Sequence, residues 1–173
     1  MKDHQQKVLE LLDTSGARLH GLLAKLTLSD QATGDLMQEL FLKLSQSRGF
    51  EKAKDPLPYA WRTAVNLAID WRRSQKIKLQ SLLPEYLPPP KGPSALEALV
   101  LKEDIQQVLD ATFRLSPLAR EAVILRYIEE ASYQEIARRL DKKPQHIRSL
   151  CSKAMARLRI IVGQQKRCSC GKE

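Results

Sequence analysis

A proline-rich run in the middle of the chain constrains its fold more than any other feature. Five of the nine prolines of the 173-residue sequence fall within residues 83–93. Proline fixes φ and lacks a backbone N–H donor, so neither a helix nor a central strand can continue through such a run. We therefore expect a semi-extended linker over residues 81–94, between folded domains over residues 1–80 and 95–165, with a tail over residues 166–173.

Both flanks of this linker show helical periodicity. Apolar residues recur at steps of three and four, which is the spacing of a buried helical stripe. In the first domain we expect such stripes over residues 8–26, 36–44 and 60–71. Asp35 is expected to begin the second helix and Phe41 to be buried in it. Because no segment shows sustained alternation with a period of two, the chain is predicted to be all-α, with two small helical domains.

The second domain contains the spacing of a helix-turn-helix. Ser132 and Glu135 form a capping-box pattern that begins a short helix, and residues 141–144 (Asp-Lys-Lys-Pro) end it. A second helix follows. Its inner face is predicted to consist of Ile147, Leu150, Cys151, Ala154 and Leu158. In a helix-turn-helix, the second helix lies in the major groove of DNA.

The charge distribution favours the same interpretation. The chain has 29 Lys and Arg against 20 Asp and Glu, and ten basic residues between Arg138 and Arg167 face the single acid Asp141. Such a patch is typical of proteins that bind phosphate backbones, although a solvated face that keeps a protein soluble would have the same composition. The outward residues of the second helix can reach phosphates and base edges. They are Gln145, His146, Arg148, Ser149, Ser152 and Lys153.

Two segments of this domain resemble a known family. Residues 115–127 and 132–137 are similar to region 4 of bacterial RNA polymerase sigma factors, in the extracytoplasmic-function (ECF) group of the sigma-70 family. In that family the second helix binds the −35 promoter element. The resemblance implies a set of −35 residues, of which those near the helix ends mainly meet phosphates. The set is Lys142, Lys143, Gln145, His146, Arg148, Ser149, Ser152, Lys153 and Arg157.

Residues 32–44 resemble region 2 of the same family, which has a typical Asp-x-x-Gln-Glu-x-Phe pattern. An exposed acidic and amide patch beside an apolar residue suits a protein partner, although this helix alone could be an ordinary amphipathic one. The resemblance implies that the partner is the RNA polymerase core, at the clamp coiled coil of its largest subunit, with the flap region as a second contact. The expected polymerase-binding residues are Asp35, Gln38, Glu39 and Leu42.

Residues 58–73 resemble the helix with which the family melts promoters. Cationic grooves and stacked aromatic rings hold single-stranded DNA. Asn66 matches an asparagine that in the family helps to hold a flipped −10 base. Trp71 is expected in the core, on the face opposite Asn66, and Trp61 has a core role as its alternative. The expected −10 residues are Tyr59, Trp61, Arg62, Asn66, Asp70, Arg72 and Arg73.

These features predict a promoter-specificity subunit that is not an enzyme and needs no cofactor. Its expected partners are the polymerase core and promoter DNA, with an anti-sigma factor as a further candidate. One alternative is a helix-turn-helix regulator, which leaves residues 35–44 and 59–73 unexplained. A second is a sigma-like adaptor that binds polymerase without initiating transcription. Its support is the turn Pro144-Gln145, where the family usually has a small hydrophobic residue and glycine.

Other functional classes find little support in the sequence. No apolar run is long enough for a bilayer, the N-terminus lacks the apolar region of a secretory signal, and three cysteines suit a reducing cytoplasm. No phosphate-binding loop or nucleophile motif is present. The tail Cys168-Ser169-Cys170 could bind metal or sense oxidants, with Cys151 or His146 as further ligands, but its spacing is not that of a zinc finger, and no metal site is predicted.

Overall fold

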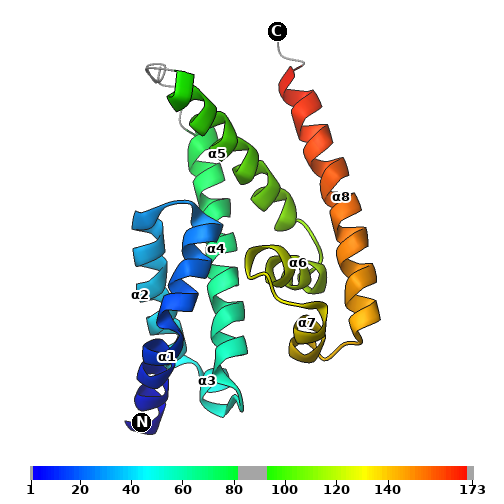
Figure 1. Ribbon diagram of the computed structural model, residues 1–173. Coiled ribbons are helices and arrows are strands. Elements are labelled where there is room, and N and C mark those ends of the chain that lie inside the picture. Colours follow the sequence, from blue (N-terminus) through cyan, green and yellow to red (C-terminus); the bar gives the residue numbers. More distant parts are fainter. Residues whose placement is uncertain (1, 82–92, 171–173) are drawn as a thin grey trace. The chain divides into compact units, whose positions relative to one another are not determined.

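The computed structural model describes the backbone of residues 2–81 and 93–170, and all regular structure in these ranges is helical (Figure 1). The prediction of an all-α protein is therefore confirmed. Residues 82–92, which hold most of the predicted linker, lie outside the described residues. The helices are α1 (Lys2–Thr27), α2 (Asp30–Gln46), α3 (Arg48–Lys52), α4 (Pro56–Ser81), α5 (Pro93–Thr112), α6 (Pro117–Val123), the π-helix η1 (Ile124–Ile128), α7 (Tyr133–Leu140) and α8 (Pro144–Cys170).

The chain divides into two compact units, Met1–Leu83 and Pro84–Glu173. Each unit buries its own apolar side chains, as an independent domain must. None of the helices in the described ranges is long and apolar enough to cross a membrane.

In the first unit, α1, α2 and α4 pack against one another, and the short α3 connects α2 to α4 (Figure 1). Their inner stripes are mostly leucine, with small alanines on α4 that allow the helices to approach closely. The fully buried side chains include Leu19, Leu22, Leu23, Leu26, Leu40, Leu44, Phe50, Ala64 and Ala68.

Two predictions for α2 are wrong. The helix begins at Asp30, because the Ser29 hydroxyl caps it by accepting a hydrogen bond from the Ala32 N–H at 3.3 Å, so Asp35 lies inside the helix. Phe41 was expected to be buried, but 37% of it is exposed. The inner stripe already contains Leu40, and the next position around the helix turns toward solvent.

In the second unit, α8 packs against α5, α6 and α7. Between α6 and α7 the chain widens into η1, where the Glu129 N–H donates to the Ile124 carbonyl five residues earlier, at 3.1 Å. One buried cluster joins α5, α6 and α8. It contains Ala111, Leu115, Ala119, Val123, Ala154 and Leu158, with Leu150, Met155, Ile161 and Val162 packed against it.

Lys7 ties the start of α1 to the turn between α3 and α4. Its Nζ donates to the carbonyls of Phe50 at 3.2 Å, Glu51 at 3.0 Å and Ala53 at 2.8 Å, and it lies 5.5 Å from the centroid of the Phe50 ring. The carbonyls at the end of a helix lack intrahelical partners and carry partial negative charge, so an ammonium group stabilises them. Lys7 therefore holds in place the segment that leads into α4.

We expect the Lys7→Met variant to lower the stability of the first unit by about 1 kcal/mol, because three carbonyls lose a charged donor but can still reach water. Both tryptophans of the chain, Trp61 and Trp71, lie in this unit, so tryptophan fluorescence during urea denaturation follows its unfolding. Lys54→Met, which removes the same charge from an exposed side chain, serves as the control. Equal denaturation midpoints for the two variants would contradict this role of Lys7.

Candidate nucleic-acid and polymerase interface

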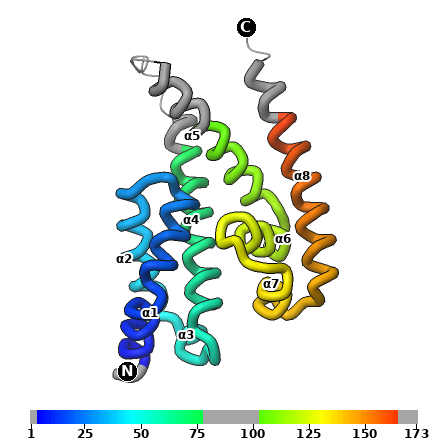
Figure 2. Tube along the Cα trace, viewed as in Figure 1, coloured from blue at the N-terminus to red at the C-terminus, as the bar shows by residue number. Residues whose placement is uncertain are grey.

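Helices α7 and α8 form the predicted helix-turn-helix (Figure 2). At the start of α7, the Ser132 hydroxyl accepts from the Glu135 N–H at 3.2 Å, and the Glu135 carboxylate accepts from the Ser132 N–H at 2.7 Å. This confirms the predicted capping box. At its end, Asp141 adopts a left-handed φ of 52°, and the Lys142 N–H reaches back to the Ala137 carbonyl at 2.9 Å. Both ends of α7 are therefore fixed by local hydrogen bonds.

Helix α8 separates its residues into an inner and an outer face, as predicted. Ile147, Cys151, Ala154 and Leu158 are buried, and Leu150 is half-buried against the core cluster. Every side chain predicted to meet the −35 element is exposed. These are Lys142, Lys143, Gln145, His146, Arg148, Ser149, Ser152, Lys153 and Arg157. With Arg159 also exposed, the outer face of α8 offers cationic and hydrogen-bonding groups, the types that can reach phosphates and base edges.

One aromatic residue of this region was not predicted from the sequence. The ring of Tyr133, the first residue of α7, has two guanidinium groups beside it: Arg126 Cζ lies 4.6 Å from its centroid and Arg148 Cζ lies 5.5 Å from it. Arg126 also donates from Nη1 to the Ala131 carbonyl at 3.0 Å. Tyr133 belongs to the sequence motif of residues 132–137, but its pairing with two arginines from other helices leaves no periodic signal.

Of the metal or redox ligands considered above, the two whose side chains are described, Cys151 and His146, lie on opposite faces of α8. Cys151 is buried on the inner face of α8, whereas His146 is exposed on the outer face. Burial raises the pKa of the Cys151 thiol, and the charge of Arg126 only partly opposes this, so the reactive thiolate is disfavoured at neutral pH. Among the residues whose side chains are described, no group of three His, Cys, Asp or Glu could hold a metal ion. The side chains of Cys168 and Cys170 lie outside that part.

In the first unit, α4 presents one polar row. Arg62, Asn66, Asp70 and Arg73 are all exposed, at helical steps of three and four, as predicted. Asp70 and Arg73 form a loose ion pair, with 3.9 Å between the carboxylate and guanidinium atoms and both side chains about two-thirds exposed. Such a pair contributes little to stability, so both charges stay available to a ligand.

Two residues expected to face −10 DNA lie elsewhere. Trp61 is only 3% exposed, because it lies one turn before the inner residues Ala64 and Val65; its alternative role as a core residue therefore holds, and its place among the exposed −10 residues is wrong. Arg72 is half-buried, and its Nη1 donates to the Leu26 carbonyl at the end of α1, at 3.4 Å. Trp71, for which a core role was expected, is half-buried. Tyr59 is therefore the aromatic residue of this set whose ring is exposed.

The position of the Tyr59 ring depends on its contacts with α3. Its hydroxyl lies 2.7 Å from Ser47 Oγ, and its ring meets the Phe50 ring edge-on at 5.9 Å between centroids. Gly49 makes room for it, because a Cβ at position 49 would come within 2.9 Å of the Tyr59 hydroxyl. With 37% of the residue exposed, Tyr59 offers part of its ring while the hydroxyl end stays anchored.

The outer face of α2 carries the residues predicted to bind polymerase. Asp35, Gln38 and Glu39 are exposed, and Leu42 is 55% exposed. Glu39 pairs with Lys43 at 3.3 Å, one turn further along the helix. Because Phe41 is exposed beside Leu42, the apolar part of this surface is larger than the sequence indicated. An apolar centre with a charged rim is typical of protein interfaces.

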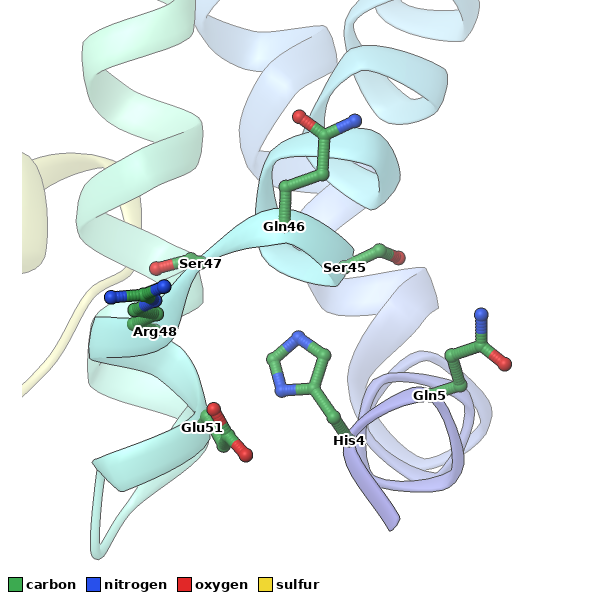
Figure 3. A pocket seen from close by; sticks show the side chains of 7 residues that line it. All are labelled: His4, Gln5, Ser45, Gln46, Ser47, Arg48 and Glu51. Carbon is green, nitrogen blue, oxygen red and sulfur yellow. The ribbon is translucent and has the colours of Figure 1, made fainter. Parts of the chain in front are cut away.

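A polar hollow of about 330 Å³ lies elsewhere in this unit, between the start of α1 and the junction of α2 and α3 (Figure 3). The His4 ring points into this junction, and its Nε2 lies 2.9 Å from the Leu44 carbonyl. None of the residues predicted to bind DNA or polymerase lines the hollow. Its lining consists of His4, Gln5, Ser45, Gln46, Ser47, Arg48 and Glu51.

The chain matches two family models, one in each unit. Residues 11–77 match Sigma-70 region 2, and residues 105–158 match Sigma-70, region 4. The first match contains α2 and α4 with their outer faces, and the second contains the helix-turn-helix. The order of the two matches along the chain is the order predicted from the motifs.

Two sigma factors align with most of the chain, in agreement with these matches. The chain is 27% identical to RNA polymerase sigma factor CarQ of Myxococcus xanthus in an alignment of 171 residues that covers 94% of each chain. It is 26% identical to ECF RNA polymerase sigma factor SigK of Mycobacterium sp. (strain KMS) over 143 residues, 80% of this chain and 74% of that one. A solved structure of the sigma factor RpoE with the anti-sigma factor NepR, from Bartonella quintana, is similar with a TM-score of 0.47 and 21% identity, covering 94% of this chain and 98% of that chain. The chain belongs to the extracytoplasmic-function group of the sigma-70 family and is a sigma subunit for transcription initiation.

Proposed function

We propose that this sigma subunit directs initiation through three surfaces, one on each of α2, α4 and α8. The outer face of α2 holds the polymerase core, the outer face of α4 opens the −10 segment, and the outer face of α8 reads the −35 element. The partners proposed on the same grounds are the polymerase core, promoter DNA and an anti-sigma factor. The observation that carries the proposal is the exposed row on α8, which lies opposite a fully packed inner stripe.

Within the α8 surface, affinity and specificity are proposed to come from different residues. Arg148 and Ser149 lie in the second turn of α8. A recognition helix contacts base edges with the residues near its N-terminus. Lys142 and Lys143 lie in the turn before α8, and we propose that they contact phosphates. A base contact discriminates between sequences, whereas a phosphate contact adds affinity for every sequence.

We expect Arg148→Ala to change the preferred −35 sequence at one base position, at a cost on the order of 1–3 kcal/mol for the original sequence. Lys143→Ala, the matched loss of one cation, should weaken binding to all sequences alike and lower the salt slope by about one. Salt-titrated selection from a randomised −35 duplex library measures both. An unchanged selected sequence for Arg148→Ala would show that α8 does not read the promoter in this way.

The α4 surface is proposed to hold the opened −10 strand. Arg62 and Arg73 supply charge along the row, and Tyr59 supplies a stacking face at its start. The Asn66 amide, in the middle of the row, offers both a donor and an acceptor to a flipped base. A flipped base loses stacking and pairing worth a few kcal/mol, which such contacts must replace.

Asn66→Ala should therefore still form a closed promoter complex but open it less, because the contacts to the flipped base are lost. Permanganate footprinting of thymines around the −10 element measures the opening, and band shifts measure the closed complex. Gln75→Ala is the matched control, since it truncates an amide nine residues further along the same helix, on the side opposite Asn66. Normal opening by the Asn66→Ala variant would show that Asn66 makes no contact that promoter opening needs.

The α2 surface is proposed to bind the polymerase core. Charge reversal at Asp35 and Glu39 should prevent co-purification with the core while leaving helicity unchanged, because both side chains are exposed and neither joins the core of the unit. The same reversal at Glu10 and Asp13, on the exposed side of α1, is the control with an equal change of net charge. Undiminished binding by the α2 variant would remove the argument for this surface.

A further inference from the structure

We propose that Tyr133 is a positioning residue for promoter recognition, which holds the Arg148 guanidinium ready for its base. This inference rests on the proposed reading of −35 DNA by α8 and adds a residue outside that helix. The observation behind it is the cluster formed by Arg126, Tyr133 and Arg148, one residue each from η1, α7 and α8.

An exposed arginine on a helix samples many rotamers, and ordering it on binding costs free energy. A guanidinium group within about 6 Å of an aromatic centroid is attracted to the ring, and Arg148 Cζ lies 5.5 Å from that of Tyr133. The contact is made before DNA arrives. The Arg148 side chain is therefore already restricted in the free protein. Less conformational free energy is lost when it is ordered on DNA.

The ring itself is held by the other arginine. Arg126 is half-buried, donates to the Ala131 carbonyl at 3.0 Å and lies 4.6 Å from the ring centroid. Since Ala131 directly precedes the capping residue Ser132, this bond also fixes the chain that leads to Tyr133. Arg126 and Arg148 carry like charges, so the half-buried cation disfavours an inward turn of Arg148 and leaves it facing solvent.

The three residues of this cluster would therefore have different roles. Arg148 would touch the base, Tyr133 would restrict its orientation, and Arg126 would anchor Tyr133. Loss of the ring would affect discrimination at the base that Arg148 contacts, and no other base. A purely structural role for Tyr133 predicts something different, namely weaker binding to every sequence alike.

The test is selection from a randomised −35 duplex library by the full-length chain carrying Tyr133→Leu, which keeps apolar bulk but removes the ring. We expect the preference at the Arg148-dependent position to fall roughly two- to five-fold, as the loss of an exposed cation–π contact implies. Affinity for non-specific DNA should change less than two-fold. Tyr133→Phe is the matched control, since it retains the ring and should retain the preference.

A double-mutant cycle supplies the decisive comparison. In the Arg148→Ala background, Tyr133→Leu should change the preference no further, because the group that it positions is absent. An equal change in both backgrounds, or a change at a different base, would overturn the positioning role. If Arg148→Ala itself leaves the selected sequence unchanged, the proposed −35 readout has failed, and the positioning role fails with it.

A measurement without DNA covers the case in which Tyr133→Leu does not fold. In the wild-type chain, NMR should show the Arg148 side-chain protons shifted by the ring current of Tyr133, and Tyr133→Phe should preserve this shift. Arg148 resonances at the positions of a free arginine would overturn the inference.

Discussion

Each helix of this chain can bury only one stripe of side chains, because its apolar residues recur at steps of three and four. On α8 that stripe packs against α5, α6 and α7, and this fixes the rotation of the helix about its axis. Arg148 and Ser152 then lie outside that stripe and face solvent. The same constraint orients Asn66 on α4. The outer surfaces are therefore consequences of packing, and a rotation that moved them would bury charge and expose apolar groups.

The features of the fold that were predicted correctly from the sequence are those that depend on local spacing. The all-α class, the capping box at Ser132 and the inner and outer faces of α8 each follow from residues a few positions apart. Phe41 was misplaced because it lies at the edge of its stripe, where a rotation of the helix by a few tens of degrees decides between core and solvent, whereas Trp61 lies within the buried stripe of α4. For Trp61, resemblance to a DNA-binding motif favoured exposure, whereas the apolar residues one turn later required burial.

Contacts between elements left no such signal. Lys7 meets carbonyls of residues 50–53, more than forty positions away, and Arg72 meets the end of α1. Tyr133 contacts arginines on two other helices. In each case the long side chain is ordinary for a surface position, and only the packing of the helices selects its partner. The candidate site could thus be outlined from the sequence, but the residues that orient its arginines and its tyrosine could not.

The glycine at position 49 shows how such orientation can be set from a distance. A Cβ at position 49 would collide with the Tyr59 hydroxyl. Because Gly49 has no side chain, the Tyr59 ring can lie close to the backbone of α3. Any larger residue at position 49 would require the Tyr59 hydroxyl, and with it the end of the ring, to shift. Gly49 therefore influences how much of the Tyr59 ring is exposed at the start of α4. It does so although it has no side chain that could itself contact DNA.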